Sequence, residues 1–469
     1  MSARNLLTTA AAAAALLTAC ATGPDYKAPA APAGTGGGFV GAAVAPVSAD
    51  QTPADWWRLY RDAALDGLIA EALANNRDLA AAAANLVQVR ASLSEARAGR
   101  LPGTTVSAAA ARSRQPDVAT GRRMAEADTV SSGLDVSYEV DVFGRVTRSI
   151  EAARADSDAA QAALDVVRVS VAAETARAYV DACATGAQLQ VARRTLALSE
   201  ETAGLTRRQL EAGRGTGLDL SRAQAQADTA RAAIPPLQAQ RDAALFRLSV
   251  LVGRPPAQVS SEAAACQAIP QITAALPVGD GAALLARRPD VRQAERRLAA
   301  ATARIGVATA ALYPQVTLGG SVGSVGGGGW DFGDQVSFSV GPLISWSFPN
   351  IAVARARIAQ ADAATQAALA TFEQTTLTAL QEAETALSAY GHELDRRTAL
   401  RRARDQSAEA VRLARLRQTA GLDSFITVLD AERTLAGLEA QLALSEAAVT
   451  SNQITLFKAL GGGWERSGL

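Results

Sequence analysis

Aromatic side chains are scarce in this sequence of 469 residues, at 4% of the total against 49% for all hydrophobic types. Aromatic residues supply much of the buried area of a thick protein core, so their scarcity argues against such a core. The apolar residues that are present are mostly Ala, Leu and Val. In an Arg-, Glu- and Gln-rich sequence, this composition indicates long, closely packed helices.

Net charge is also missing, because 46 basic side chains are balanced by 46 acidic ones. A nucleic-acid-binding protein normally carries an excess of positive charge, so we expect no nucleic-acid partner. A long disordered chain would combine high net charge with low hydrophobicity, and this sequence shows neither property.

Long hydrophobic runs and catalytic patterns are absent as well. The longest apolar run, Leu6 to Ala19, is shorter than the roughly 20 residues that a membrane-spanning helix needs. The sequence has one histidine, His392, whereas a metal site needs several converging ligands. It has no phosphate-binding loop, cysteine cluster or nucleophile–base pattern. We therefore expect that the chain is not an enzyme and that it holds no metal and no cofactor.

The first twenty residues have the pattern of a secretory signal: Arg4, a short Ala- and Leu-rich stretch, and small residues before Cys20. The cysteine directly follows Leu17-Thr18-Ala19, which resembles the lipobox of bacterial lipoproteins. By that resemblance, residues 1–19 are removed as a lipoprotein signal peptide and Cys20 becomes the lipidated N-terminus. Ala21 at the next position resembles the sorting pattern for the outer membrane. The alternative is an ordinary signal peptide that has a cysteine near its end.

The rest of the chain divides into two similar halves. Residues Asn76–Pro102 align with Arg288–Pro314 at an offset of 212, and Ala212-Gly213 aligns with Ala420-Gly421 at an offset of 208. Self-similarity over such a period is typical of an internal repeat. The predicted divisions are a lipidated N-terminal tether of residues 20–55, a first repeat of residues 56–256, a linker of residues 257–280, a second repeat of residues 281–464 and a tail of residues 465–469. Because the tether is rich in Pro, Gly and Ala, we expect it to be extended and to bury little surface.

Each half has the same order of predicted elements: a helical stretch, two strands, a very long helix, a turn that contains glycine, and a shorter return helix. The long helices are expected over Arg145–Glu211 and Ile351–Gln418, each about 100 Å long at about 1.5 Å per residue. The return helices are expected over Leu218–Val252 and Ser424–Leu460. The pair Pro235-Pro236 should kink the first return helix or split it.

Alternation of apolar and small or charged residues marks two strands, Val130–Phe143 and Gln335–Phe348. Their partners, about Thr104–Arg112 and Val316–Val325, are richer in Gly and Ala. The pattern fits a half-buried antiparallel sheet and equally a membrane β-barrel with an apolar outer face. The side chains expected to face lipid are Val136, Tyr138, Val140, Phe338, Trp346 and Phe348. Because a membrane barrel needs about eight strands and open edges in lipid are costly, several copies of the chain would have to share one barrel.

Short motifs along the chain are similar, in their order and spacing, to those of one family. They include Gly23-Pro24-Asp25-Tyr26, Trp56-Trp57, Asn76-Arg77-Asp78-Leu79, Tyr138-Glu139-Val140-Asp141-Val142-Phe143-Gly144-Arg145, Arg287-Arg288-Pro289-Asp290, Tyr313-Pro314, Gly341-Pro342 and Gly461-Gly462-Gly463-Trp464. Together these motifs resemble the TolC-like outer-membrane efflux channels, in the lipoprotein (NodT-type) subgroup that serves resistance-nodulation-division pumps. The resemblance extends from Cys20 to Trp464.

The resemblance implies a mainly α-helical fold with a small β part. In this family three protomers each give four strands to a twelve-stranded outer-membrane barrel, and their long helices form a periplasmic tunnel that is closed at its tip. The resemblance also implies the partners: a homotrimer, a periplasmic adaptor, an inner-membrane resistance-nodulation-division transporter and outer-membrane lipid. The chain would be a passive duct for efflux, anchored to the bacterial outer membrane by a covalent lipid at Cys20. The alternative is a periplasmic coiled-coil adaptor or a structural outer-membrane lipoprotein, against which the duplicated order of elements argues.

Two further predictions depend on the family. Its closed tip is held by an acidic residue early on the last return helix and an arginine one turn later, which match Asp430 and Arg433, with Ile426 as an apolar ring. Some relatives have a second Asp where Thr427 stands, so one carboxylate ring is expected here and not two. The alternative is that Asp430 and Arg433 form only a surface pair on one helix, worth about 0.2–0.5 kcal/mol.

The second concerns the two remaining cysteines. Cys183 lies on the first long helix, and Cys266 lies in the linker, which in this family surrounds the middle of the tunnel. The periplasm permits disulfides. We predict a Cys183–Cys266 bond, and the alternative is two free, buried thiols.

Overall fold

The computed structural model describes residues 21–30, 34–114, 126–327 and 336–463. Two compact units are present. The first contains residues 1–30, 85–161 and 293–373, and the second contains residues 31–84, 162–292 and 374–469. Within the described ranges, no helix is long and apolar enough to cross a membrane.

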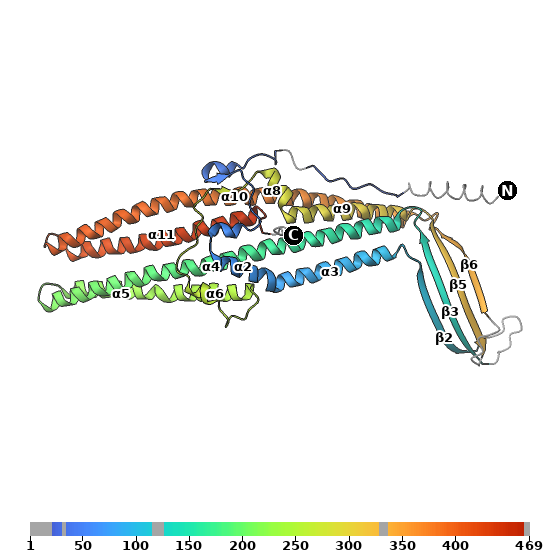
Figure 1. The fold of residues 1–469 in the computed structure, drawn as a ribbon, viewed down its shortest axis with the longest axis horizontal. Helices are drawn as coiled ribbons and strands as arrows, with labels where there is room; N and C mark the ends of the chain where they lie inside the picture. Colours follow the sequence, from blue (N-terminus) through green and yellow to red (C-terminus); the bar gives the residue numbers. More distant parts are fainter. Residues whose placement is uncertain (1–20, 31–33, 115–125, 328–335, 464–469) are drawn as a thin grey trace. The chain divides into compact units, whose positions relative to one another are not determined.

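The first unit contains a four-stranded antiparallel sheet in the order β2-β3-β5-β6 (Figure 1). Its strands are β2 (Gly103–Ser113), β3 (Ala127–Val140), β5 (Gln315–Gly327) and β6 (Val336–Ser345). All four predicted strands are therefore present. The predicted ends of the two alternating strands are wrong by up to three residues, because β3 stops at Val140 and β6 stops at Ser345.

The long helices agree closely with the periodicity. Helix α4 is Arg145–Glu211, as predicted, and helix α10 is Ala352–Thr419. Two further helices are α3 (Arg77–Ala98) and α9 (Pro289–Ala310), and all four have residues in both units. The start of α4 is capped by Asp141, whose carboxylate accepts hydrogen bonds of 2.8 Å from the backbone N–H groups of Val146 and Thr147.

The second unit is almost entirely helical. Its elements are η2 (Val40–Val44), β1 (Val47–Ser48), η3 (Trp56–Tyr60), α2 (Ala63–Asn75), α5 (Gly217–Ala232), α6 (Ile234–Leu251), α7 (Ser261–Ala265), β4 (Leu276–Pro277), α8 (Gly281–Arg287) and α11 (Phe425–Ala459). The first return helix is split into α5 and α6 at Ala233, two residues before Pro235. Proline lacks an N–H and is tolerated in the first turn of a helix, so α6 begins there.

The internal repeat is visible in how the helices end. Gly213 and Gly421 have positive φ angles of 70° and 71°, and Gly253 and Gly461, also 208 residues apart, have 79° and 69°. After each glycine the next N–H bonds to the carbonyl five residues earlier, as in the contact from Arg214 to the carbonyl of Gln209. This is the Schellman geometry that glycine favours. The sequence offset therefore corresponds to a repeated backbone conformation.

The main core lies in the second unit. Trp56 is fully buried and stacks on Phe457 with a centroid distance of 4.9 Å. Gly462 lies against it so closely that a Cβ there would be 2.7 Å from Trp56 Cδ1. The other fully buried large apolar side chains around them are Leu65, Ile69, Leu276, Leu387, Ile454 and Leu456.

Residues 20–55, predicted to be an extended tether, keep most of their described side chains exposed or half-buried, but the segment makes specific contacts with distant parts of the chain. In the second unit Phe39 is only 8% exposed, and the N–H groups of Val40 and Gly41 bond to the carboxylate of Glu384 at 2.8 and 2.7 Å. Strand β1 pairs in parallel with β4 of the linker. These contacts join segments more than 200 residues apart, which local composition does not reveal.

Candidate functional site

The sheet has one apolar face. The cross-strand register aligns Leu134 with Val322, and Val322 with Phe338, and directly opposite residues share a face. Because side chains alternate along a strand, Val136, Tyr138 and Val140 lie on this same face. Phe338 is 81% exposed. Four of the six predicted lipid-facing residues thus share one face of the sheet.

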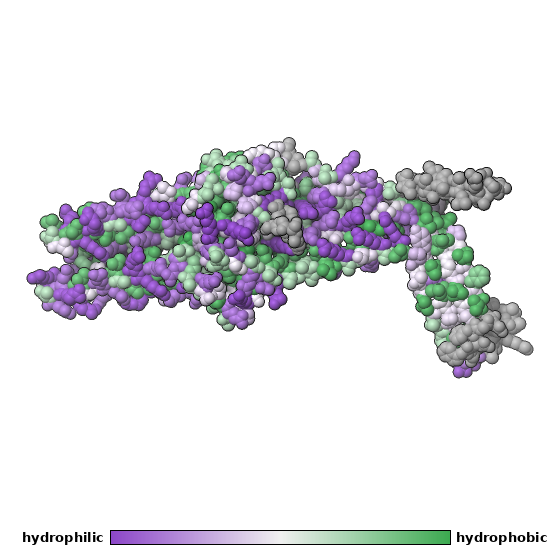
Figure 2. All heavy atoms as spheres, in the orientation of Figure 1, coloured by the Kyte–Doolittle hydropathy of each residue, from purple (hydrophilic) through white to green (hydrophobic). Residues whose placement is uncertain are grey.

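The opposite face is mostly small and polar, although it also carries Val325 and Leu343. It carries Asp135, Ser137 and Glu139 from β3, with Ser321 and Ser339 bonded to each other at 2.8 Å. On the side that Figure 2 shows, hydrophobic residues lie on the sheet, whereas hydrophilic residues predominate over the helices. A sheet with one exposed apolar face and one polar face fits a wall between lipid and water.

The other two predicted lipid-facing residues, Trp346 and Phe348, lie beyond the end of β6. They stack with a centroid distance of 4.6 Å, and Trp346 Nε1 donates a 3.1 Å hydrogen bond to the carbonyl of Leu312. Both are exposed, at 51% and 63%. Their assignment to the strand is wrong, because the pairing with β5 ends at Ser345. Exposed Trp at the end of a strand is typical of a membrane–water interface.

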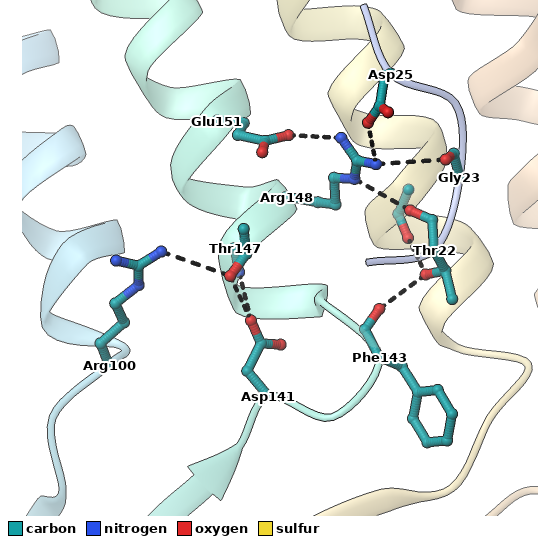
Figure 3. A network of polar contacts seen from close by, with 10 residues as sticks. Thr22, Gly23, Asp25, Arg100, Asp141, Phe143, Thr147, Arg148 and Glu151 are labelled. Carbon is teal, nitrogen blue, oxygen red and sulfur yellow. Dashed lines mark hydrogen bonds and ion pairs between the residues drawn. The ribbon is translucent and has the colours of Figure 1, made fainter. Parts of the chain in front are cut away.

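A network of polar contacts lies where β3 passes into α4 (Figure 3). Its centre is Arg148, whose side chain is only 6% exposed. Arg148 contacts Asp25 at 2.7 Å and Glu151 at 2.8 Å. Burial lowers the pKa of Arg148, whereas hydrogen bonds to these two carboxylates raise it. The net effect is a raised pKa. The guanidinium therefore stays charged and holds the residues around it.

The tip residues lie on α11, as predicted. Arg433 Nη1 is 3.8 Å from Asp430 Oδ1, and both side chains are about two-thirds exposed, at 66% and 67%. Arg433 also donates a 3.3 Å hydrogen bond to Gln226 Oε1 on α5. Ile426 is 42% exposed, and Thr427 lies 3.3 Å from the hydroxyl of Ser424. Arg433 thus connects α11 to α5. The alternative, a surface pair within one helix, predicts no contact with a second helix.

A second charged group at the tip was not predicted. Glu432, whose side chain is only 14% exposed, accepts hydrogen bonds of 2.7 and 3.0 Å from Arg415 of α10. Thr202 of α4 donates to the same carboxylate at 3.4 Å. In the turn between α10 and α11, two hydrogen bonds from Arg417 hold the pKa of Asp423 below its usual value. Glu432 lies between Asp430 and Arg433 in sequence, and helical periodicity places it on a different face of α11 from Asp430. That this face is buried depends on the packing of α4 and α10 against it.

The structure joins Cys183 to Cys266. Their sulfur atoms are 2.08 Å apart, and Cys183 is fully buried. The linker runs close to α4 here, because a Cβ on Gly186 would lie 2.5 Å from the carbonyl oxygen of Cys266. Cys20 lies outside the described residues. Within the described ranges, no group of three or more His, Cys, Asp or Glu side chains is placed to hold a metal ion.

Comparison with known proteins identifies the family. A profile described as "outer membrane efflux protein" matches residues 68–254 and 282–462. The chain belongs to the outer membrane efflux protein family. Outer membrane protein OprJ of Pseudomonas aeruginosa is 33% identical over 469 residues, which cover 96% of this chain and 94% of that protein. The toluene efflux pump outer membrane protein TtgF of Pseudomonas putida is 31% identical over 471 residues, which cover 96% and 95%.

Solved structures of the family have the same fold. The outer-membrane channel OprN matches with a TM-score of 0.88 and 36% identity, over 95% of this chain and 100% of that chain. This outer membrane efflux protein is therefore a TolC-like channel subunit, and the adaptor alternative is not supported. Members of the family are channels and not enzymes.

Proposed function

We propose that three copies of the chain form a passive efflux duct, with twelve strands closing one barrel in the outer membrane. The observation that carries this proposal is the four-stranded sheet. Its exposed apolar face needs lipid, and the outer edges of its two end strands, β2 and β6, are not paired with another strand in the described part of the chain. A single copy has too few strands to close a barrel, and closure removes unpaired edges. Heterologous pairing of β2 with β6 of a neighbour gives a ring.

Extraction of outer-membrane fractions in detergent, followed by sizing and mass measurement, tests this arrangement. A species with three chains is expected. A monomer in the soluble periplasmic fraction would refute the duct.

Cys20 is proposed to carry a covalent lipid that anchors the mature chain to the outer membrane. The support is Leu17-Thr18-Ala19 directly before the cysteine. Mass spectrometry of the N-terminal peptide should show acyl chains on residue 20. An unmodified cysteine, or a chain that still begins at Met1, would contradict this proposal.

The duct is proposed to work with a periplasmic adaptor and an inner-membrane transporter of the resistance-nodulation-division class. The name of the relative TtgF places that protein in a toluene efflux pump, which supports a similar setting for this chain. Affinity purification of the channel from crosslinked cells should recover both partners. Recovery of the channel without either one would count against the assembly.

Opening is proposed to be a helix shift at the tip, where α11 moves relative to α5. Arg433 and Gln226 connect these two helices, and Asp430 is the carboxylate that a cation would meet there. Ile426 and Thr427, one turn earlier on α11, complete the proposed gate. Single-channel conductance of tip variants tests this proposal.

A further inference from the structure

The segment Thr22–Tyr26 is held firmly in the first unit, although it follows directly on the proposed lipidation site. The backbone N–H and the hydroxyl of Thr22 both bond to the carbonyl of Phe143, at 3.2 and 2.9 Å. Phe143 itself stacks on Tyr313 with a centroid distance of 4.6 Å. The first residue of the segment, Thr22, is therefore attached to the turn between β3 and α4.

Arg148 binds both the backbone carbonyls and the carboxylate of this segment. Its guanidinium donates to the carbonyls of Thr22 at 3.1 Å and Gly23 at 3.4 Å, and to Asp25 at 2.7 Å (Figure 3). Glu151 on the next turn of α4 holds the remaining side of the guanidinium at 2.8 Å. A buried arginine with four partners fixes the segment in one position, because each donor of its planar fork has a set direction.

The packing of the segment requires glycine at two facing positions. Gly23 has a φ of +88°, and a Cβ there would lie 2.5 Å from Gly306 Cα on α9. A Cβ on Gly306 would lie 2.7 Å from the carbonyl oxygen of Thr22 and 2.7 Å from Arg148 Cγ. Glycine is otherwise a poor residue within a helix, so its presence in α9 serves this close approach.

Tyr26 completes the docking at the other end. Its hydroxyl donates a 2.5 Å hydrogen bond to Glu295, and its ring packs against a cluster that includes Ala155 and Ala300. Burial, followed by the contact with Glu295, raises the pKa of Tyr26 above its usual value, so the phenol remains a donor.

We propose that these residues form a built receptor for the chain's own N-terminal segment, which holds Ala21 against the turn after β3 and so determines where a lipid on the preceding cysteine can enter the membrane. A Cβ on Gly144 would lie 2.7 Å from Ala21 Cα, so Ala21 is pressed against the turn after the strand. Arg148 is the positioning residue, and Gly306 provides the space. The claim that lipid is what becomes positioned rests on the proposed function; the docking itself does not.

Proteolysis at Lys27 tests the docking directly. The sequence has two lysines, Lys27 directly after the docked segment and Lys458 within α11. A lysine-specific protease must draw several residues on each side of the cut into its active site, so docking of Pro24–Tyr26 should slow the cut at Lys27. The experiment uses the full-length channel in detergent and follows the released N-terminal peptide by mass spectrometry.

Gly306→Ala is the decisive variant, because alanine favours the helix while its methyl group excludes Thr22. Cleavage at Lys27 should accelerate by about tenfold or more in Gly306→Ala and in Arg148→Ala, as expected for the loss of a charge-assisted contact. Gly437→Ala on α11, where a Cβ meets nothing within 4 Å, and Arg304→Ala, which breaks a contact with Asp156 on α4, are the controls and should match the wild type. The thermal unfolding of all variants shows whether each has folded.

Wild-type cleavage as fast as that of a free peptide of the same sequence would overturn the proposal. So would an unchanged rate in folded Gly306→Ala. The mass of the released peptide reports separately whether Cys20 carries lipid, so lipidation can fail while docking holds, and the reverse.

Discussion

The contact between Arg433 and Gln226 predicts which tip residue resists opening. Asp430 and Arg433 lie on the same helix, so a movement of α11 carries both and leaves their 3.8 Å pair intact. The 3.3 Å hydrogen bond from Arg433 to Gln226 joins α11 to α5 and must break. A single exposed hydrogen bond contributes about 0.5–1 kcal/mol, so the three copies in the proposed trimer contribute about 1.5–3 kcal/mol. That corresponds to an increase of about 10- to 150-fold in the ratio of open to closed channels when the contact is removed.

Single-channel recording in planar bilayers measures this ratio. Gln226→Ala and Arg433→Ala should each open the channel to a similar degree, and the double variant should add little, because both remove one contact. Asp430→Ala should change cation preference more than open probability. Arg412→Ala, which breaks an ion pair within α10, is the matched control. Wild-type open probability in both Gln226→Ala and Arg433→Ala would refute the reasoning, as would a larger effect from Asp430→Ala.

Three further predictions concern stability. Replacing Cys183 and Cys266 with alanine should lower the free energy of unfolding by about 4–5 kcal/mol, because the bond closes a loop with a sequence separation of 83. The readout is a lower Tm. In the wild type, alkylation without reduction should label neither cysteine. Trp56→Ala should cost about 3–5 kcal/mol in the free energy of unfolding, measured by denaturant titration, because the side chain is fully buried and stacked. Arg417 lowers the pKa of Asp423, so the contact protects the tip turn at neutral pH and is lost as pH falls through that lowered pKa. Asp423→Asn should therefore speed proteolysis of this turn at neutral pH, and the difference from the wild type should vanish in acid.

Features that depend on neighbours in sequence could be predicted. Helix α4 begins at Arg145 and ends at Glu211 as expected, because a 3.6-residue periodicity and a glycine at the end are local signals. The alternation along β3 and β6 likewise identified the apolar face. The same signal misassigned Trp346, because a strand ends where its partner's pairing ends and not where its own alternation ends.

Features that depend on distant neighbours could not be predicted. Composition presented residues 20–55 as a loose tether, whereas Gly41 and Glu384, 343 residues apart, are in hydrogen-bond contact. At the tip, Asp430 and Arg433 were located by resemblance, but Gln226 was not, since only the packing of α5 against α11 brings it near. The buried environment of Glu432 has the same origin.

The short parallel pairing of β1 with β4 also constrains the order in which segments of the chain fold during synthesis. Val47 pairs with Leu276, which is made 229 residues later, so this contact cannot form until more than half of the chain exists. The segment that surrounds it packs on Leu387 and Gly391 of α10, which appear later still. Closing so long a loop has a large entropic cost that is recovered only once its partners are in place. The segment around β1 therefore reaches its native contacts only after most of the chain that follows it has been made, and it remains accessible to processing enzymes until then.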